Sequence, residues 1–322
     1  MIKKPSIIFL GTPEFAVPSL EILIKNDYNI LAVVTVADKP AGRGQKINSS
    51  PVKQCAEKHG LKILQPSNLK DEKFLEELES LKADLQIVVA FRMLPEAVWK
   101  MPKLGTFNLH GSLLPHYRGA APINWAIING ENKSGVTTFF LKHEIDTGNI
   151  ILQKEVNIST EDSAGTLHDK MMEIGSELVL ETVKLIENGK VLSTEQNKLI
   201  VDEIKTAPKL NRANTSFSIN FSPDQARNFI RGLNPFPAAH TEIYNSNGIG
   251  FSAKIFSAES YDVPHSFAIG KMETDNKNYL RIYLKGGYLH VTELQISGRT
   301  KMKIKDFLNG VKLEGEWVVN QI

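Results

Sequence analysis

Short apolar runs alternate with helix-like stretches through the first 90 residues, and this alternation restricts the fold more than any other feature. The apolar or β-branched runs, each long enough for one buried strand, are Ile7–Leu10, Ile30–Val36, Leu61–Leu64 and Leu85–Phe91. The stretches between them with helical character are Pro13–Lys25, Pro51–His59 and Asp71–Leu81. This order predicts a parallel sheet with helices on both faces. Ligands of such sheets bind outside the carboxyl ends of the strands, so we expect functional residues there.

The turn after the first strand argues against one class of cofactor. Leu10-Gly11-Thr12-Pro13 resembles the start of a mononucleotide-binding fold, but the G-x-G-x-x-G pattern is absent. The sequence therefore does not support a nicotinamide or flavin cofactor, and Gly11 is expected to serve the tight turn itself. We assign the N-terminal part to the α/β class, as a Rossmann-like sheet.

The pattern changes in the second half of the chain. Two further strands, Thr106–Leu109 and Thr137–Leu141, a helix over Ala121–Asn129 and a long helix over Ala164–Asn188 complete the first domain, residues 1–189. Residues 190–209 lack periodicity and are expected to be a linker. Residues 210–322 contain a short helix and alternating, turn-punctuated segments; the expected elements are Pro223–Gly232, Thr241–Tyr244, Lys254–Ser257, Tyr279–Leu284 and Leu289–Ile296. This pattern predicts a small OB-like β-barrel, a fold often used on nucleic acids.

Composition indicates a cytoplasmic globular protein of 322 residues, a length that favours two domains. The longest apolar runs, such as Leu31–Val34 and Ile87–Phe91, are far too short for a membrane helix of roughly 20 residues. The N-terminus lacks the apolar core and the cleavage site of a signal peptide, so we expect no membrane partner. Cys55 is the single cysteine, which excludes an internal disulfide and a multi-cysteine zinc site.

Charge is distributed unevenly along the chain. The sequence has 38 Lys and Arg against 36 Asp and Glu, a net charge of +2. Residues 206–322 hold 14 of these bases and 10 of these acids, so the C-terminal part is mildly basic. A basic surface suits a polyanionic partner such as nucleic acid, although a small imbalance on a solvated surface explains the same numbers.

The segment Phe107–Pro122 combines residues that suit chemistry on a carbonyl group. Asn108 and His110 are two residues apart at the end of an expected strand, so both side chains point to one face. An amide beside an imidazole can stabilise a developing oxyanion. Asp146 lies in an expected turn before the next strand; if it reaches His110, it orients the ring and keeps it protonated as a donor. A structural histidine and a turn-forming aspartate are the alternatives.

These residues resemble a known family. The runs NLHGSLLPHYRGAAPINWAIINGE, GVTTFFL and DTGNII are similar to the motifs of folate-dependent formyltransferases, which use 10-formyltetrahydrofolate to formylate an amine. The resemblance implies that Asn108, His110 and Asp146 are catalytic. The folate contacts that it implies are Val89, Phe91, Arg92, Met93, Leu94, Ser112, Leu113, Leu114, Pro115 and Asp146. Arg92 departs from the glycine that many members have, which bears on the shape of this loop.

Two further regions resemble the branch of this family that formylates initiator methionyl-tRNA. One is the loop Asp38–Lys46 followed by Ser50–Lys53, and the other is the C-terminal part, with Ala207–Leu210, Arg231–Ala238 and Leu294–Arg299. The resemblance thus covers nearly the whole chain. The loop residues assigned to tRNA binding are Lys39, Arg43, Lys46 and Lys53.

Local composition supports these tRNA contacts without requiring them. Glycine and proline separate the bases of the loop, and a mobile basic loop suits a phosphate backbone; a solvated surface loop is the simpler alternative. In the C-terminal part Arg299, Lys301, Lys303 and Lys305 alternate, so on a strand they share one face. That face is either a tRNA contact or an edge protected by charge.

We therefore expect a monomeric transferase with a folate co-substrate, initiator methionyl-tRNA as partner and no metal. His110, His116 and His143 lack the spacing of metal ligands, and Cys55, one turn before His59, is expected to be a small buried residue. The amine would attack the formyl carbon while Asn108 and protonated His110 donate to the oxyanion. Alternatives are a sugar-nucleotide formyltransferase, a formyltetrahydrofolate hydrolase, or a non-catalytic RNA-binding protein, which would have no use for the Asn–His–Asp set.

Overall fold

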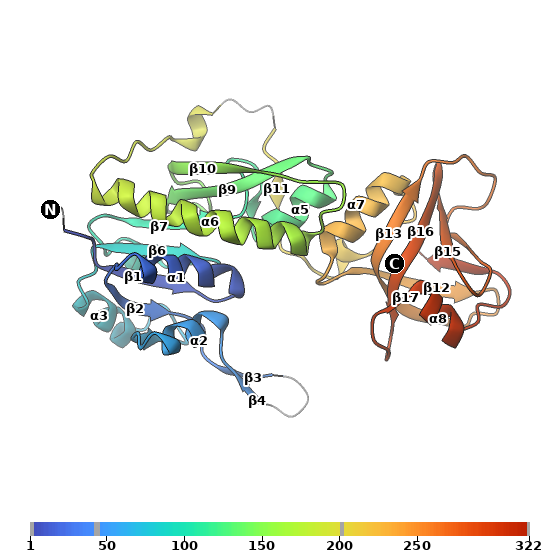
Figure 1. The fold of residues 1–322 in the computed structure, drawn as a ribbon, viewed down its shortest axis with the longest axis horizontal. Helices are drawn as coiled ribbons and strands as arrows, with labels where there is room; N and C mark the ends of the chain where they lie inside the picture. The colour runs from blue at the N-terminus through green and yellow to red at the C-terminus, as the bar shows by residue number, and fades with distance from the viewer. Residues whose placement is uncertain (1–2, 42–45, 200–202, 321–322) are drawn as a thin grey trace. The chain divides into compact units, whose positions relative to one another are not determined.

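The computed structural model describes residues 3–41, 46–199 and 203–320 (Figure 1). The chain forms two compact units. Unit 1 comprises Met1–Pro122, Ser134–Asn157 and His168–Thr206, and unit 2 comprises Ile123–Lys133, Ile158–Leu167 and Ala207–Ile322. Two segments that precede residue 168 thus belong with the C-terminal unit. The boundaries at residues 189 and 209 stay a prediction.

Unit 1 is built on one seven-stranded sheet. Its strands, in spatial order, are β10 (Ile150–Asn157), β9 (Lys133–Phe140), β7 (Thr106–His110), β6 (Leu85–Val89), β1 (Ile7–Gly11), β2 (Ile30–Val34) and β5 (Ile63–Leu64). The five strands from β7 to β5 are parallel, which confirms the predicted sheet, whereas β9 pairs antiparallel with β7. A parallel pairing of β7 and β9 would need a crossover connection that packs on the sheet. The helix that connects these two strands, α5 (Pro122–Ile128), groups with unit 2 instead.

Helices cover both faces of this sheet, as predicted (Figure 1). They are α1 (Val17–Lys25), α2 (Pro51–Lys58), α3 (Glu72–Ser80), α4 (Glu96–Trp99) and α6 (Ala164–Glu187), with short turns η1 (Glu14–Ala16) and η2 (Gln196–Lys198). On one face, Phe74 of α3 packs in a buried cluster with Ile8 of β1. On the other, a Cβ at Gly175 of α6 would lie 2.8 Å from Leu109 of β7. Glycine is needed there because the helix and the strand approach closely.

Capping residues explain where two of these helices begin. The Ser50 hydroxyl accepts a hydrogen bond from the Lys53 N–H at the start of α2, and Asp71 does the same for the Phe74 N–H at the start of α3. Such caps satisfy backbone donors that have no partner inside the helix. Two pairs of short strands lie outside this sheet. β3 (Lys39–Ala41) pairs with β4 (Lys46–Asn48), and β8 (Arg118–Gly119) pairs with β11 (Thr206–Ala207).

Unit 2 contains a closed barrel of six strands. The ring consists of β12 (Ala239–Asn245), β13 (Gly250–Tyr261), β16 (Gly287–Ile296), β15 (Leu280–Leu284), β14 (Lys271–Thr274) and β18 (Trp317–Asn320), and the pairing of β13 with β16 closes it. The helices and turns of this unit are α5, η3 (Ala213–Thr215), α7 (Pro223–Leu233) and α8 (Ile304–Gly310), and β17 (Met302–Lys303) extends from β16. The predicted barrel is confirmed. The sequence missed β14 and β18, because four-residue strands give little alternation.

One expectation about the barrel is wrong. Lys301, Lys303 and Lys305 do not share the face of a strand, because β17 has only two residues and α8 begins at Ile304. The alternating bases instead span a turn, a two-residue strand and a helix. No helix in the described part of the chain is long and apolar enough to cross a membrane.

Candidate active site

Strand β7 carries Asn108 and His110 to the carboxyl edge of the sheet. Asn108 pairs with Val88 of β6 and with Phe139 of β9, and β7 ends at His110. His110 is 6% exposed and Asn108 is half-buried. Among the described residues no side chain or backbone group hydrogen-bonds the Asn108 amide. Two polar side chains thus share one face at the edge where ligands bind in such sheets.

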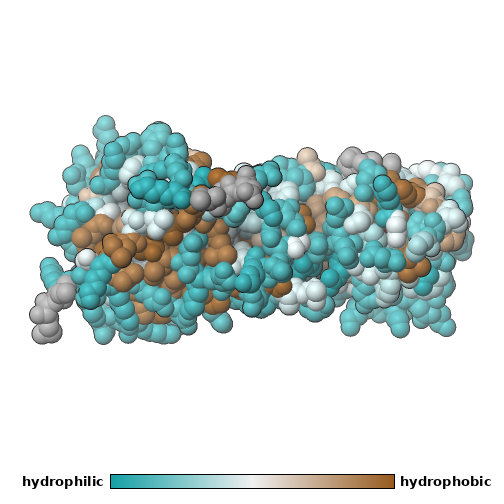
Figure 2. Space-filling model, turned by 90° about the horizontal axis from the view of Figure 1, so that it is seen from above, coloured by the Kyte–Doolittle hydropathy of each residue, from teal (hydrophilic) through white to brown (hydrophobic). Residues whose placement is uncertain are grey.

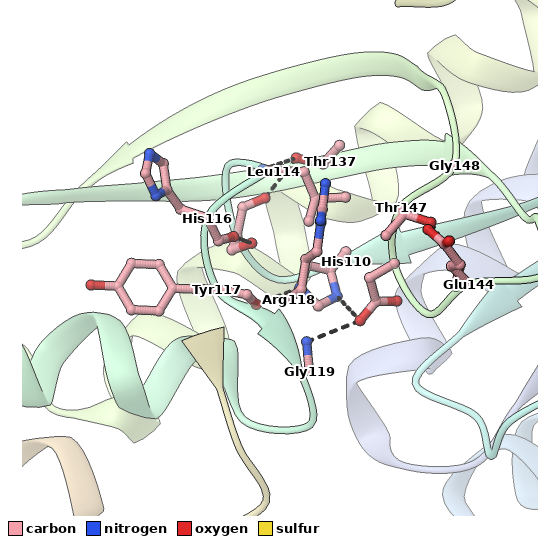
Figure 3. A network of polar contacts seen from close by, with 12 residues as sticks. His110, Leu114, His116, Tyr117, Arg118, Gly119, Thr137, Glu144, Thr147 and Gly148 are labelled. Carbon is pink, nitrogen blue, oxygen red and sulfur yellow. Dashed lines mark hydrogen bonds and ion pairs between the residues drawn. The ribbon is translucent and has the colours of Figure 1, made fainter. Parts of the chain in front are cut away.

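The loop after β7 fixes the orientation of the His110 ring (Figure 3). The His110 Nε2 atom lies 2.8 Å from the Tyr117 carbonyl oxygen, so Nε2 carries a proton and donates it there. Tyr117 has φ +60°, which turns the chain back toward the strand. Ser112 supports this turn because its hydroxyl donates to the His116 carbonyl over 2.7 Å. The ring is therefore held through Nε2, and Nδ1 is the nitrogen left for other partners.

Asp146 lies beside that second nitrogen. Its Oδ2 atom is 4.0 Å from His110 Nδ1 and accepts a hydrogen bond of 3.0 Å from the Gly119 N–H. A separation of 4.0 Å is too long for a hydrogen bond, so the imidazole and the carboxylate face each other but are not hydrogen-bonded. Gly148 lets the turn reach this position, because a Cβ there would lie 1.6 Å from the Phe140 carbonyl oxygen.

The backbone has positive φ at three non-glycine residues around this edge. These are Ala90 after β6 (φ +47°), Tyr117 after β7 (φ +60°) and Asp146 before β10 (φ +53°). Such conformations are unfavourable for residues with a Cβ and cluster at functional sites. Their gathering at the ends of neighbouring strands independently marks this edge as the candidate active site.

Several residues that hold the site together were not predicted from the sequence. Tyr117 and Gly119 act through backbone groups, so their side-chain identity carries no signal. Arg118 and Gln196 act through side chains: the Arg118 guanidinium donates to Gln196, and the Gln196 amide donates to the Asp146 carbonyl. Gln196 lies in the expected linker, where no local pattern distinguishes it.

The segments expected to contact folate lie along the same edge, but several of their side chains are buried. Val89, Ser112 and Leu114 are no more than 2% exposed, so a ligand could reach only their backbone. Pro115 is buried and Leu94 is 9% exposed, whereas Phe91 and Leu113 are half-buried.

Two loops of the candidate site carry exposed apolar side chains. Met93, in the loop after β6, is 72% exposed, and Ile145, next to Asp146, is 58% exposed. Figure 2 shows hydrophobic residues gathered in its left half, within a largely hydrophilic surface. Loops that carry both exposed apolar groups and polar groups favour a ligand that combines an apolar and a polar part.

Arg92 has a structural function in the loop after β6. Its guanidinium donates to the Pro66 and Ser67 carbonyl oxygens, the latter over 3.1 Å. These residues follow β5, so Arg92 ties the loop after β6 to the loop after β5. The side chain fastens the edge of the site instead of entering it.

The basic residues of the expected tRNA loop are placed only in part. Arg43 lies outside the described residues, and Lys39 and Lys46 belong to the β3–β4 ribbon. Lys53 is 16% exposed, forms an ion pair with Asp38 and lies 3.8 Å from Glu57. The hydrogen bond from Lys53 lowers the pKa of the Asp38 carboxyl. The charge of Lys53 is thus already compensated within the protein.

The basic residues of the barrel are exposed and have few partners. Lys301 forms an ion pair of 2.9 Å with Glu293, whereas no acidic partner of Arg299 or Lys303 is found within the described residues. A hollow of about 320 Å³, which the sequence analysis did not anticipate, lies on strands β12, β13 and β16. Its polar lining includes Arg212, His240, Glu242, Ser252, Lys254 and Gln295. Burial, with the charges of Lys254 and Arg212, lowers the pKa of His240.

Cys55 has neighbours that could in principle ligate a metal. Its sulfur, a Glu21 oxygen and a His59 nitrogen all lie within 4.8 Å of one another. Burial, together with the Glu21 charge, raises the pKa of the Cys55 thiol. A thiol kept protonated is a poor nucleophile and a poor metal ligand, so we assign no chemistry to this group.

Comparison with known proteins decides the family. The formyl transferase family model matches residues 4–183, and the model of the formyl transferase C-terminal domain matches residues 209–312. The methionyl-tRNA formyltransferase of Flavobacterium johnsoniae is 51% identical over 315 residues, which cover 98% of this chain and 99% of that protein. The chain belongs to the methionyl-tRNA formyltransferase family. The Bacteroides fragilis member is 50% identical over 308 residues, 95% of each chain.

A solved structure shares the fold of this methionyl-tRNA formyltransferase family member. The N-formyltransferase from Helicobacter canadensis, solved in complex with folinic acid and dTDP-3-aminofucose, has a TM-score of 0.66. The match covers 90% of this chain and 99% of that chain at 24% identity. This likeness establishes the α/β-plus-barrel fold. The amine acceptor has to be argued from the full-length relatives and from the site.

Proposed function

We propose that this chain transfers the formyl group of 10-formyltetrahydrofolate to the α-amine of initiator methionyl-tRNA, with Asn108, His110 and Asp146 as catalytic residues. The observation that carries the proposal is the His110–Asp146 pair at the carboxyl end of β7, 4.0 Å apart and beside a free amide. Close relatives over the full chain are methionyl-tRNA formyltransferases, which supports tRNA as the acceptor. In this scheme the folate is a co-substrate, no metal takes part, and the enzyme acts as a cytoplasmic monomer.

The geometry assigns separate tasks to the two nitrogens of His110. Nε2 is held by the Tyr117 carbonyl, so Nδ1 is the atom that can donate to the substrate. The protonated ring and the Asn108 amide would donate to the formyl oxygen as it gains negative charge, which is the arrangement of an oxyanion hole. Asp146 faces the same nitrogen and stabilises the positive charge of the ring.

The nucleophile needs no activation by a covalent intermediate. An α-amine has a reference pKa of about 7.7–8.0, so a useful fraction is neutral near pH 7. The amine nitrogen bonds to the formyl carbon, and the tetrahedral intermediate then breaks the bond from that carbon to the folate nitrogen. The amine loses one proton and the folate nitrogen gains one. Asp146, which is half-buried, is placed to assist this transfer through water.

Substrate binding would use the two kinds of surface around the site. The exposed Met93 and Ile145 side chains offer apolar contacts for the ring system of the folate, with Arg92 holding the loop in shape. The basic loop that contains Arg43, together with Arg299, Lys301 and Lys303 of the barrel, would contact tRNA phosphates. Lys53 would join them only if its pair with Asp38 opened.

A comparison of acceptors tests this function. The purified protein is given formyl-folate with charged initiator tRNA, charged elongator tRNA, an aminosugar nucleotide or no acceptor. We expect rapid formylation of the initiator tRNA alone. Preferred transfer to the aminosugar nucleotide, or release of formate without an acceptor, would support the sugar-nucleotide formyltransferase or the hydrolase instead.

Arg43→Ala tests the basic loop in the same assay. We expect formylation of charged initiator tRNA to fall about tenfold or more, because a two-pronged arginine contact is worth about 1–3 kcal/mol. Folate affinity and melting temperature should not change, and Arg43→Lys should recover only part of the loss. The matched control is Lys70→Ala, which removes an exposed base elsewhere in unit 1. Equal losses in the Arg43 and Lys70 variants would contradict a specific contact.

A further inference from the structure

Gln196 uses its full hydrogen-bonding capacity inside the protein. It lies in η2, after the long helix α6, and is 3% exposed. Its Nε2 donates to the Asp146 carbonyl over 2.9 Å and to the Gly148 carbonyl over 2.8 Å. Its Oε1 accepts from Arg118 Nε over 3.1 Å and from Arg118 Nη2 over 2.6 Å. A primary amide has two donor hydrogens and two acceptor lone pairs, and here all four are used.

These four bonds join the two segments that hold the catalytic pair. Arg118 stands between Tyr117, whose carbonyl accepts from His110, and Gly119, whose N–H donates to Asp146 (Figure 3). The other two bonds fix the backbone of the Asp146 turn itself. The residues that contact His110 and Asp146, Tyr117 and Gly119, are thus the two chain neighbours of the Arg118 that Gln196 bonds. All of these residues belong to unit 1.

His110 and Asp146 need this support because no direct bond between them fixes their separation. No hydrogen bond joins His110 to Asp146 across their 4.0 Å separation, and Asp146 has a backbone conformation, φ +53°, that is uncommon for residues other than glycine. The distance between ring and carboxylate therefore depends on the segments that carry them. A displacement of about 1 Å in a catalytic group can reduce the rate about 10²-fold.

We propose that Gln196 is a positioning residue for formyl transfer, which ties the Asp146 turn to the Tyr117–Gly119 segment and thereby sets the distance between His110 and Asp146. This inference rests on the proposed function for the roles of His110 and Asp146. It goes beyond that function because it gives the segment after α6, which the sequence suggests is only a linker, a part in the catalytic apparatus.

Two substitutions separate positioning from general stability. Gln196→Met keeps the volume and removes all four bonds, whereas Gln196→Glu keeps the acceptor for Arg118 and loses both donations to the Asp146 turn. We expect both variants to lose about 30- to 100-fold in kcat, with KM for both substrates within about threefold of wild type. The neighbouring Glu195→Gln, which changes an exposed side chain, should match wild type. Wild-type kcat in the Gln196 variants, or loss confined to KM, would overturn the proposal.

A double-mutant cycle shows whether Gln196 acts through Asp146. In an Asp146→Asn background, the further change Gln196→Glu should lower kcat less than about threefold, because residues that act as a unit are not additive. Single-turnover rates make the slow variants measurable, and circular dichroism verifies their fold. Fully additive losses would show that Gln196 acts independently of Asp146, against the proposal.

The cycle is run on whichever formyl acceptor the wild-type enzyme uses: methionyl-tRNA, aminosugar nucleotide or water. Failure of tRNA as an acceptor would contradict the proposed function alone, since the cycle on the other acceptor still decides the role of Gln196. Transfer to tRNA by wild type with full additivity in the cycle would contradict this inference alone.

Discussion

Asp84 precedes β6 at the amino edge of the unit 1 sheet, whereas Asp146 lies in the loop between β9 and β10, beside His110 at the carboxyl end of β7. Each accepts a backbone N–H over 3.0 Å, from Ser6 and Gly119 respectively. Asp84 also accepts from the Ser6 hydroxyl and forms a 2.9 Å ion pair with Lys103. The backbone hydrogen bond from Ser6 and then Lys103 lower its pKa to about 2.

The two carboxylates differ in how many of their partners the protein itself supplies. Asp84 is surrounded by donors that belong to the protein, so its charge contributes to stability. Asp146 lies in a backbone conformation that is uncommon outside glycine, and its neighbour His110 is 4.0 Å away, so no hydrogen bond joins the two side chains. An aspartate thus stabilises the fold when the protein supplies all its partners, and it is available for function when one contact is left open.

His110→Ala should have the largest effect on activity. We expect kcat for formyl transfer to fall about 10²–10³-fold, the usual loss when one oxyanion donor is removed, with the fold and folate binding retained. Asn108→Ala should act in the same way. Steady-state kinetics and equilibrium folate binding measure this, and near-normal turnover in His110→Ala would overturn the catalytic assignment.

Gly148→Ala should damage the carboxyl edge sterically. Its new Cβ would clash with the Phe140 carbonyl, so the turn has to move. We expect a loss of about 2 kcal/mol or more in the free energy of unfolding, and lower kcat in the remaining folded protein. Gly310→Ala is the control, since a Cβ at that glycine would lie 3.4 Å from the end of the Arg299 side chain, an ordinary contact. Equal destabilisation in both variants would mean that the close contact is irrelevant.

Asp84→Asn should affect stability without affecting catalysis. The folded protein lowers the pKa of Asp84 from 3.8 to about 2, so the charged carboxylate stabilises the fold above pH 4, and this stabilisation disappears as the pH falls to 2. We expect a loss of about 1 kcal/mol in the free energy of unfolding at pH 7, and none near pH 2. Denaturation at both pH values tests this. A large drop in kcat in this variant would break the contrast between the two edges.

Lys303→Ala should have the smallest effect. Its exposed ammonium lacks an acidic partner among the described residues, so its loss should leave stability and kcat unchanged. We expect tRNA affinity to fall only a few-fold and the slope of affinity against salt to decrease by about 1, as for one lost phosphate contact. Binding titrations at several salt concentrations measure this. Lys285→Ala, another exposed base of unit 2, is the comparison; an equal effect there would indicate diffuse charge.

Local sequence was sufficient for much of the fold and for the centre of the site. The alternation of apolar runs predicted the parallel strands, and the two-residue spacing of Asn108 and His110 placed both on one face. Prediction from local sequence failed where patterns are short or ambiguous. The strands β14 and β18 have only four residues each, and the alternating bases from Arg299 to Lys305 do not form one strand.

Contacts between distant segments were decided by the tertiary structure alone. Asp146 is 36 residues after His110 in the sequence, and Gln196 is 50 residues after Asp146, yet the order of strands and the packing of loops bring them together. Likewise, the sequence led us to expect Lys53 to bind tRNA, while the fold pairs it with Asp38. The sequence by itself determines periodicity and turn chemistry, which act over a few residues. Which distant side chains meet, and whether a contact is closed or left open, depends on how whole elements pack.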